Sequence, residues 1–275
     1  MRFKQILIII TFSTLGMSSC NNLSQNSKNE NKTSVIDKKP IVIQPKKNSD
    51  TIALPLDSIY SVKILTVGIF HNNEVSNNDK NQQWLGLFKN KKGFYLKRTK
   101  IRTEKINDLT LDTEEEKTGW EVSTIIKDTC MILIEPLPFL KERKIKKFKL
   151  AKDTIFPNDT LQFKYLGIDY NLFATGNKEI VNEGLKQVEI WNYKLYLVAE
   201  IKGQKRTSLL VNQGNFNYDM IQIIFAGDID GDGILDLIIN TPRYYYERSP
   251  TLYLSRPANN EEVVKRIGAH TTVGA

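Results

Sequence analysis

Apolar and polar residues alternate over several short stretches of this chain, with clusters of Gly, Asn and Asp between them. The alternation is clearest in Ser61–Val67, Gly93–Lys97, Thr129–Ile134 and Leu161–Tyr165. A period of two residues places every second side chain on one face, as in a half-buried β-strand. Long segments with a 3.6-residue period do not compete with these strands. The pattern therefore predicts an all-β fold.

The clearest predicted hairpin joins Ile190–Ile201 to Thr207–Val211 across the turn Lys202–Lys205. Gly203 can adopt the positive φ that a short hairpin turn requires. Short strands, short connections and scattered turn residues favour an antiparallel β-sandwich or an open barrel.

Two apolar runs near the end of the chain, Ile221–Ala226 and Leu237–Ile239, predict two late strands with buried faces. The segment between them places four carboxylates at alternating or near-alternating positions with two glycines, in the order Asp228-Ile229-Asp230-Gly231-Asp232-Gly233-Ile234-Leu235-Asp236. Ionised carboxylates this close repel one another by roughly 1 kcal/mol per close pair even in water. A cation is therefore expected among them.

Calcium suits this spacing, because it accepts about six to eight oxygen ligands in an adaptable shell. Positions 1, 3, 5 and 9 supply side chains and position 7 a carbonyl, so the predicted ligands are Asp228, Asp230, Asp232, the carbonyl of Ile234, and Asp236. The alternative is an Asp- and Gly-rich turn that binds nothing. Since no His or nucleophile lies beside the loop, we expect a structural ion rather than a catalytic one.

An EF-hand is excluded, because it needs Glu at position 12, where this chain has Ile239, and helices rather than strands on both sides. The segment Phe225–Leu237 resembles the calcium-binding loop of FG-GAP and VCBS-type repeats, which occur in integrin-like propellers and many bacterial surface proteins. The resemblance implies bound calcium. The chain carries a single copy without an internal period, whereas a propeller needs one unit per blade. In this respect it is similar to uncharacterised lipoproteins of Bacteroidota-type bacteria that contain one FG-GAP-like loop.

The amino terminus has the features of an export signal. A basic start is followed by the apolar run Ile6–Met17, which is too short to span a bilayer as a helix. The sequence Met17–Cys20 resembles a bacterial lipobox, which implies a signal peptide over residues 1–19 and lipidation of Cys20. The alternative is an ordinary secretory leader in which Cys20 is incidental.

The composition divides the exported chain into a linker and a folded domain. Residues 20–55 are rich in Asn, Ser and Lys and lack aromatic residues, which predicts a disordered linker. Residues 56–275 are expected to form a β-rich calcium-binding domain, either single or built of two packed halves. The lipid on Cys20 would hold this domain in the bacterial cell envelope, with the outer membrane favoured, facing the periplasm or the surface.

The remaining candidates point away from catalysis. Cys130 lies in an apolar run and is expected to be a buried, unreactive thiol. His71 and His270 lack the paired spacing of a metal site. The sequence has no Ser elbow, P-loop or HExxH motif. We therefore expect no catalytic residue and no organic cofactor.

Two features of the sequence each allow two interpretations. The basic segment Lys141–Lys149, in a chain of net charge +8, is either a solvated edge strand or a contact for an anionic envelope component, and we favour the edge strand. Tyr244–Tyr246 and Tyr253 form either an aromatic platform or part of a packed sheet, and we favour packing.

The expected function is that of a binding or envelope-interaction module with a glycan or protein ligand, and export argues against nucleic acid as a partner. One alternative is a secreted hydrolase that acts on envelope polysaccharide or peptide, with calcium as scaffold. Another is an accessory subunit of an envelope machine.

Overall fold

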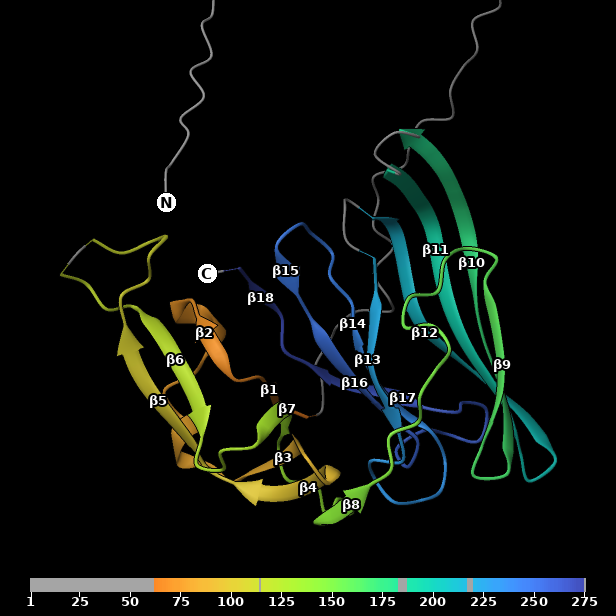
Figure 1. The fold of residues 1–275 in the computed structure, drawn as a ribbon, viewed down its shortest axis with the longest axis horizontal. Helices are drawn as coiled ribbons and strands as arrows, with labels where there is room; N and C mark the ends of the chain where they lie inside the picture. The colour runs from red at the N-terminus through yellow and green to blue at the C-terminus, as the bar shows by residue number, and fades with distance from the viewer. Residues whose placement is uncertain (1–61, 114, 183–186, 217–219, 275) are drawn as a thin grey trace, which may run out of the picture. The chain divides into compact units, whose positions relative to one another are not determined.

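The computed structural model describes residues 62–113, 115–182, 187–216 and 220–274, all of which belong to one compact unit (Figure 1). The predicted signal peptide, Cys20 and the predicted linker lie outside the described residues.

The described regular elements are β-strands and two short 3-10 helices, η1 (Asn72–Glu74) and η2 (Asp79–Asn81). The strands are β1 (Ile64–Leu65), β2 (Gly68–Phe70), β3 (Trp84–Asn90), β4 (Gly93–Thr99), β5 (Ile101–Ile106), β6 (Gly119–Thr124), β7 (Thr129–Ile134), β8 (Arg143–Ile145), β9 (Thr160–Tyr165), β10 (Ile168–Asn182), β11 (Gln187–Ile201), β12 (Gln204–Phe216), β13 (Gln222–Gly227), β14 (Asp236–Asn240), β15 (Glu247–Arg248), β16 (Pro250–Leu254), β17 (Lys265–Ala269) and β18 (Thr272–Val273). Within these described residues, no helix is long and apolar enough to span a lipid bilayer.

The strands form four antiparallel sheets and one two-stranded ribbon. Sheet A has the order β1-β7-β3-β4-β8, sheet B β2-β6-β5, sheet C β13-β14-β16-β17 and sheet D β12-β11-β10-β9, and the ribbon pairs β15 with β18. The sheets stack face to face and do not close into a barrel. The predicted all-β class is confirmed, and the arrangement is compatible with a β-sandwich.

Three hydrophobic clusters separate the sheets in the order D, C, A, B (Figure 1). Leu195 of sheet D and Leu237 of sheet C belong to the first cluster. Ile238 of sheet C and Ile132 of sheet A belong to the second. On the other face of sheet A, Trp84 packs in the third cluster with residues of sheet B. Sheets C and A are therefore buried on both faces.

Burial on both faces explains the uninterrupted apolar run in β14. Leu237 and Ile239 contribute to the cluster shared with sheet D, whereas Ile238 between them contributes to the cluster shared with sheet A. All three side chains are at most 1% exposed. Because successive side chains on a strand point to opposite faces, a strand between two cores needs an apolar residue at every position.

Most of the predicted strands are confirmed, and β4, β7 and β9 cover the expected segments. The segment Ser61–Val67 is the exception, because its described residues, from Val62 onward, form a strand only at β1. The predicted hairpin is formed by β11 and β12 with a turn of two residues, shorter than expected. Lys202 and Gly203 have φ values of 53° and 75°, as a type I′ turn requires.

Candidate metal centre

The Asp-rich loop connects β13 to β14 in sheet C, between two late strands as predicted. Gly231 and Gly233 have φ values of 84° and 86°, a region that side chains with a Cβ rarely adopt. The side chain of Arg143 also occupies the space that a Cβ at Gly231 would fill. The two glycines therefore permit both the tight course of the loop and the approach of Arg143.

Three of the predicted ligands converge in this loop. Asp228, Asp230 and Asp236 each offer a carboxylate oxygen within 4.8 Å of the others, and their exposures are 7%, 4% and 0%. Asp232 lies outside this group. Its Oδ1 accepts hydrogen bonds from the Ile234 amide at 2.8 Å and from Ser255 Oγ at 2.9 Å. The loop thus forms a buried cluster of three carboxylates, with a fourth turned toward Ser255.

Burial makes the ionised form of this cluster costly without a cation. Loss of solvent raises the pKa of the Asp230 carboxyl to about 6, with the charges of Asp232 and Asp228 adding to the effect. The pKa of Asp236 is also raised well above its usual range, first by burial and then by the charge of Asp230. Asp230 Oδ1 is buried and has no hydrogen-bond partner among the described residues. A cation at this point would supply both the missing charge and the missing partner.

Backbone amides fix the orientation of two of the carboxylates. Asp228 accepts hydrogen bonds from the amides of Gly231, Asp232 and Gly233, at 2.6, 3.1 and 3.2 Å. Asp236 accepts from the Ile229 and Asp230 amides through Oδ2, at 2.6 and 3.1 Å, and from the Ser255 amide through Oδ1, at 2.7 Å. The carboxylates of Asp228 and Asp236 are thus held in place by amides of the loop and by the amide of Ser255, just after β16.

Residues of three sheets hold the loop. Arg143 of β8 in sheet A approaches Asp228 with 3.3 Å between Nη2 and Oδ2. In sheet D, the hydroxyl oxygens of Tyr165 and Tyr170 accept hydrogen bonds from the amides of Asp228 and Leu235, both at 3.0 Å. The Arg256 amide, just after β16, donates to Asp230 Oδ2 at 2.9 Å. The sequence did not identify these supporting residues, because they lie far from the loop along the chain.

The donor set fits calcium. All the converging side-chain donors are carboxylate oxygens, which are the preferred ligands of this hard cation, and one of them has no other partner. The buried cluster could therefore hold a metal ion.

The two histidines have structural partners. His71 Nδ1 lies 2.5 Å from Asp108 Oδ2, and this contact raises the pKa of the imidazole. His270 Nδ1 accepts a hydrogen bond from the Thr66 amide at 3.2 Å, and its Nε2 lies 3.0 Å from the carbonyl of Glu74. Burial lowers the pKa of His270. Each imidazole therefore connects separate segments of the fold.

Cys130 is a free, half-buried thiol, and burial raises its pKa to about 12. Its Sγ lies 3.6 Å from the carbonyl oxygen of Ile132. The thiolate is the reactive form, so a raised pKa agrees with the expected low reactivity.

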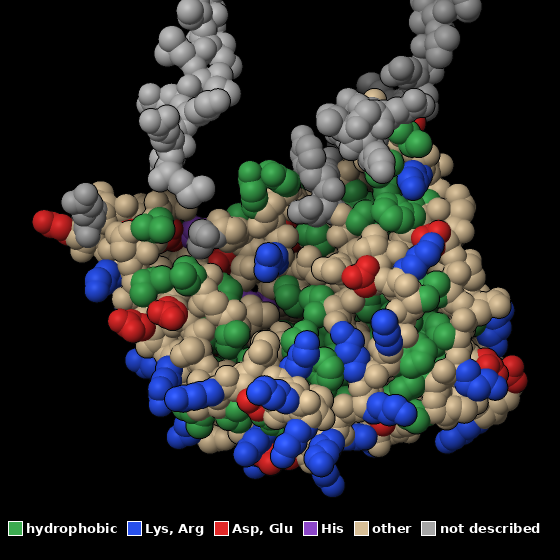
Figure 2. Space-filling view, viewed as in Figure 1, with side chains coloured by type: hydrophobic (Ala, Val, Ile, Leu, Met, Phe, Trp, Pro, Cys, Tyr) green, Lys and Arg blue, Asp and Glu red, His purple; other side chains and the backbone are tan. Residues whose placement is uncertain are grey.

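The basic segment Lys141–Lys149 contains β8, which is an edge strand of sheet A, as predicted. In Figure 2, Lys and Arg side chains gather along the lower margin, where Figure 1 shows β4 and β8. Lysines on an edge strand oppose pairing with another sheet.

The prediction for the tyrosine cluster was wrong in part. Tyr253 is buried in β16, but Tyr244, Tyr245 and Tyr246 are 66%, 48% and 65% exposed. They lie in a turn between β14 and β15, and Tyr246 has a φ of 67°. The alternation that places Tyr253 in a strand does not extend back to these three residues, so their rings face solvent.

Comparison with protein-family models finds one match, to the FG-GAP repeat, over residues 222–253. These residues comprise β13, the Asp-rich loop, β14, β15 and most of β16. Neither the curated proteins nor the solved structures provide a match to the chain. An FG-GAP repeat indicates a propeller-like or extracellular binding module, and such repeats often bind calcium. Residues 222–253 therefore match an FG-GAP repeat, and this repeat includes the carboxylate cluster.

Proposed function

We propose that this chain is an exported lipoprotein, anchored in the cell envelope through Cys20, whose β-domain is stabilised by calcium and acts as a binding or envelope-interaction module. The observation that carries the proposal is the buried carboxylate cluster with an unpartnered Asp230 Oδ1 inside an FG-GAP repeat. The proposed ligands are Asp228, Asp230, Asp232, the carbonyl of Ile234, and Asp236.

The proposed role of calcium is structural. The loop contacts Arg143 of sheet A and the hydroxyl groups of Tyr165 and Tyr170 in sheet D, while its own strands belong to sheet C. An ion that neutralises the carboxylates would keep the loop in the conformation that these contacts require. Calcium would thereby stabilise the packing of three sheets, without a part in chemistry.

The first experiment is thermal unfolding of the purified protein with calcium and with chelator. If calcium is present at about 100 times its Kd, linkage gives about 2.7 kcal/mol of stabilisation. For a domain of this size, that corresponds to a rise in Tm of roughly 5–10 °C. The Asp230→Asn variant should lose the rise. The matched control is Asp169→Asn, because the Asp169 side chain is 72% exposed and lies in β10, outside the cluster.

Equal Tm values with calcium and with chelator would contradict the calcium proposal. A calcium response that persists unchanged in Asp230→Asn would instead contradict the proposed ligand set.

The proposed anchor has a separate test. The lipobox-like sequence Met17–Cys20 supports attachment of lipid to Cys20. Stable anchoring takes two signals, such as two acyl chains, and the proposed lipid on Cys20 would supply them. The Cys20→Ala variant lacks this lipid, so it should move from the membrane fraction to the soluble fraction. Unchanged fractionation would contradict lipidation at this residue. Fractionation of inner and outer membranes would test the proposed outer-membrane location.

A further inference from the structure

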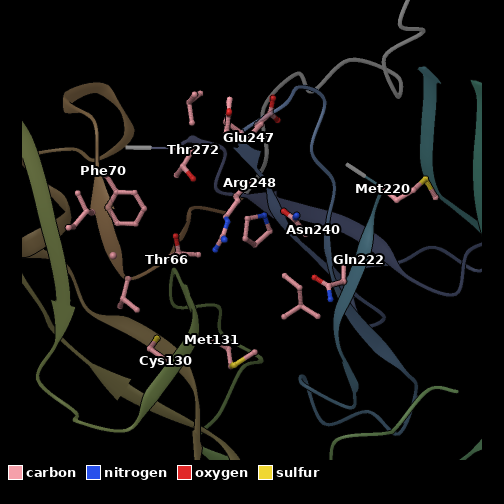
Figure 3. A pocket seen from close by; sticks show the side chains of 18 residues that line it. Thr66, Phe70, Cys130, Met131, Met220, Gln222, Asn240, Glu247, Arg248 and Thr272 are labelled. Atoms are coloured by element: carbon pink, nitrogen blue, oxygen red, sulfur yellow. The ribbon is translucent and has the colours of Figure 1, made fainter. Parts of the chain in front are cut away.

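A cleft of about 850 Å³ lies beside the exposed tyrosine turn, and none of the three clustered carboxylates is among its described lining residues (Figure 3). Its walls come from β2 of sheet B, β7 of sheet A, β13 and β14 of sheet C, and the ribbon of β15 and β18. The volume lies within the range of roughly 300–1,000 Å³ that is typical of small-molecule sites. The cleft is therefore large enough to hold a ligand.

Arg248 provides a positive charge inside this cleft. Its side chain extends from β15 toward the middle of the cleft, with Thr66 and Asn240 on either side (Figure 3). No described residue forms an ion pair or a side-chain hydrogen bond with its guanidinium group. The arginine therefore offers several hydrogen-bond donors to an incoming anion.

Glu247 is the one carboxylate among the described residues that line the cleft, and it does not neutralise Arg248. It is 6% exposed, and it accepts hydrogen bonds from the backbone amides of Arg243 and Tyr244. Figure 3 shows its side chain directed away from that of Arg248, as expected for successive residues of a strand. The lining thus lacks the two facing carboxylates that glycoside hydrolysis requires, and it favours the binding of an anion.

Neutral polar groups complete the interior. Asn240 uses its Oδ1 to accept the Ser249 amide at 2.8 Å, which leaves its Nδ2 without an acceptor among the described residues. The hydroxyl group of Thr272 also lines the cleft. An amide donor and a hydroxyl group are suitable partners for the hydroxyl groups of a ligand.

The tyrosine turn forms an aromatic rim. Tyr246 lines the cleft and is 65% exposed. The side-chain hydrogen bonds of Glu247 to the Arg243 and Tyr244 amides hold the turn. In addition, the Glu247 amide donates to the Tyr244 carbonyl at 3.2 Å, and the Gly274 amide donates to the Tyr246 carbonyl at 2.8 Å. The Tyr246 ring also lies against the Tyr245 ring, with 3.7 Å between the ring centroids. These contacts hold the Tyr246 ring in place, and its exposed surface can contact an apolar surface of a ligand.

We propose that this cleft binds a carboxylated saccharide, with the carboxylate on Arg248 and a sugar ring against Tyr246. A guanidinium group pairs with a carboxylate through two parallel hydrogen bonds. The amide and hydroxyl groups of the interior suit sugar hydroxyls, and the exposed ring suits the apolar face of a sugar. The inference rests on the proposed binding role and gives that role a site and a ligand class.

The test measures binding by calorimetry with the full-length protein in saturating calcium. The probes are oligosaccharides of galacturonate, glucuronate and sialic acid, each beside its methyl ester, which keeps the ring but removes the charge. At least one acidic probe should bind about 10-fold or more tightly than its ester. Arg248→Gln should weaken that binding by about 10- to 100-fold, as expected for the loss of a charge-assisted pair.

Two further variants distinguish a loss of binding at the cleft from a general effect of removing an arginine or a tyrosine. Tyr246→Asn should weaken binding without disturbing the turn, because Asn tolerates the positive φ of this residue. Arg98→Gln is the matched control, since Arg98 is an exposed arginine of β4 that does not line the cleft, and its affinity should equal that of the wild type.

The proposal would be overturned if no acidic saccharide bound more tightly than its ester, or if Arg248→Gln and the wild type had equal affinity. A peptide with a free carboxyl terminus, compared with its amidated form, is a further probe. Binding of the free-carboxyl peptide without binding of any saccharide would also overturn the proposal. Calcium-dependent unfolding of each variant is measured in parallel. Saccharide binding without a calcium response would refute the calcium proposal alone, and a calcium response without saccharide binding would refute the cleft proposal alone.

Discussion

The position of sheet C between two hydrophobic cores predicts that adjacent residues of β14 are both essential for stability. Ile238 is 1% exposed in the cluster shared with sheet A, and Ile239 is 0% exposed in the cluster shared with sheet D. Replacing a buried Ile by Ala costs about 2–5 kcal/mol through lost burial and the cavity that remains. For a domain of this size, each substitution should lower Tm by roughly 5–20 °C.

The assay is thermal unfolding of Ile238→Ala and Ile239→Ala in saturating calcium, followed by circular dichroism and repeated in urea. Ile180→Ala is the matched control, because Ile180 is 60% exposed in β10 and its loss should change stability by no more than about 0.5 kcal/mol. In a sheet with one solvent-exposed face, one of the two β14 variants would behave like the control. That result would refute the stacking of sheet C between sheets A and D.

Three other predictions concern contacts between distant segments. Gly268→Ala should lower Tm, because a Cβ there would lie 2.5 Å from the side chain of Ile64, and thermal unfolding would detect the loss. Tyr170→Phe should cost about 1–3 kcal/mol by leaving the Leu235 amide buried without its acceptor, as measured by urea unfolding; an unchanged midpoint would argue against that hydrogen bond. Burial lowers the pKa of His270, so this residue disfavours the folded state as pH falls below the unfolded value of about 6.5. The stability advantage of the wild type over His270→Gln should therefore shrink between pH 7.5 and pH 5, and a constant difference would contradict this assignment.

The sequence predicted local features of the fold better than distant ones. The turn at Gly203 and the strands around the Asp-rich loop could be predicted because their signals lie within a few neighbouring residues. The tyrosine cluster was assigned to a packed sheet because aromatic residues favour strands, yet a turn there exposes all three rings.

For the candidate sites too, the sequence predicted local features better than contacts between distant segments. Spacing alone predicted a carboxylate cluster from Asp228 to Asp236, and the structure brings three of those side chains together. The supporting contacts of Arg143 and Tyr170 depend on how separate sheets pack, and no local pattern encodes them. The sequence did not identify Arg248 as a binding residue either. Its proposed role depends on the cleft around it and on the absence of an ion-pair partner among the described residues, and neither can be read from neighbouring positions.

The chain order of the sheets has a consequence for biosynthesis. Sheet C begins at Gln222, after all the strands of sheets A, B and D, yet it lies between A and D. While the polypeptide is being made, the apolar faces of sheets A and D therefore lack their partner until the strands of sheet C have been synthesised. A prematurely terminated product would expose both faces and would be prone to aggregation and proteolysis. The stacking of sheets D, C and A thus cannot form until β13, β14, β16 and β17 have been made.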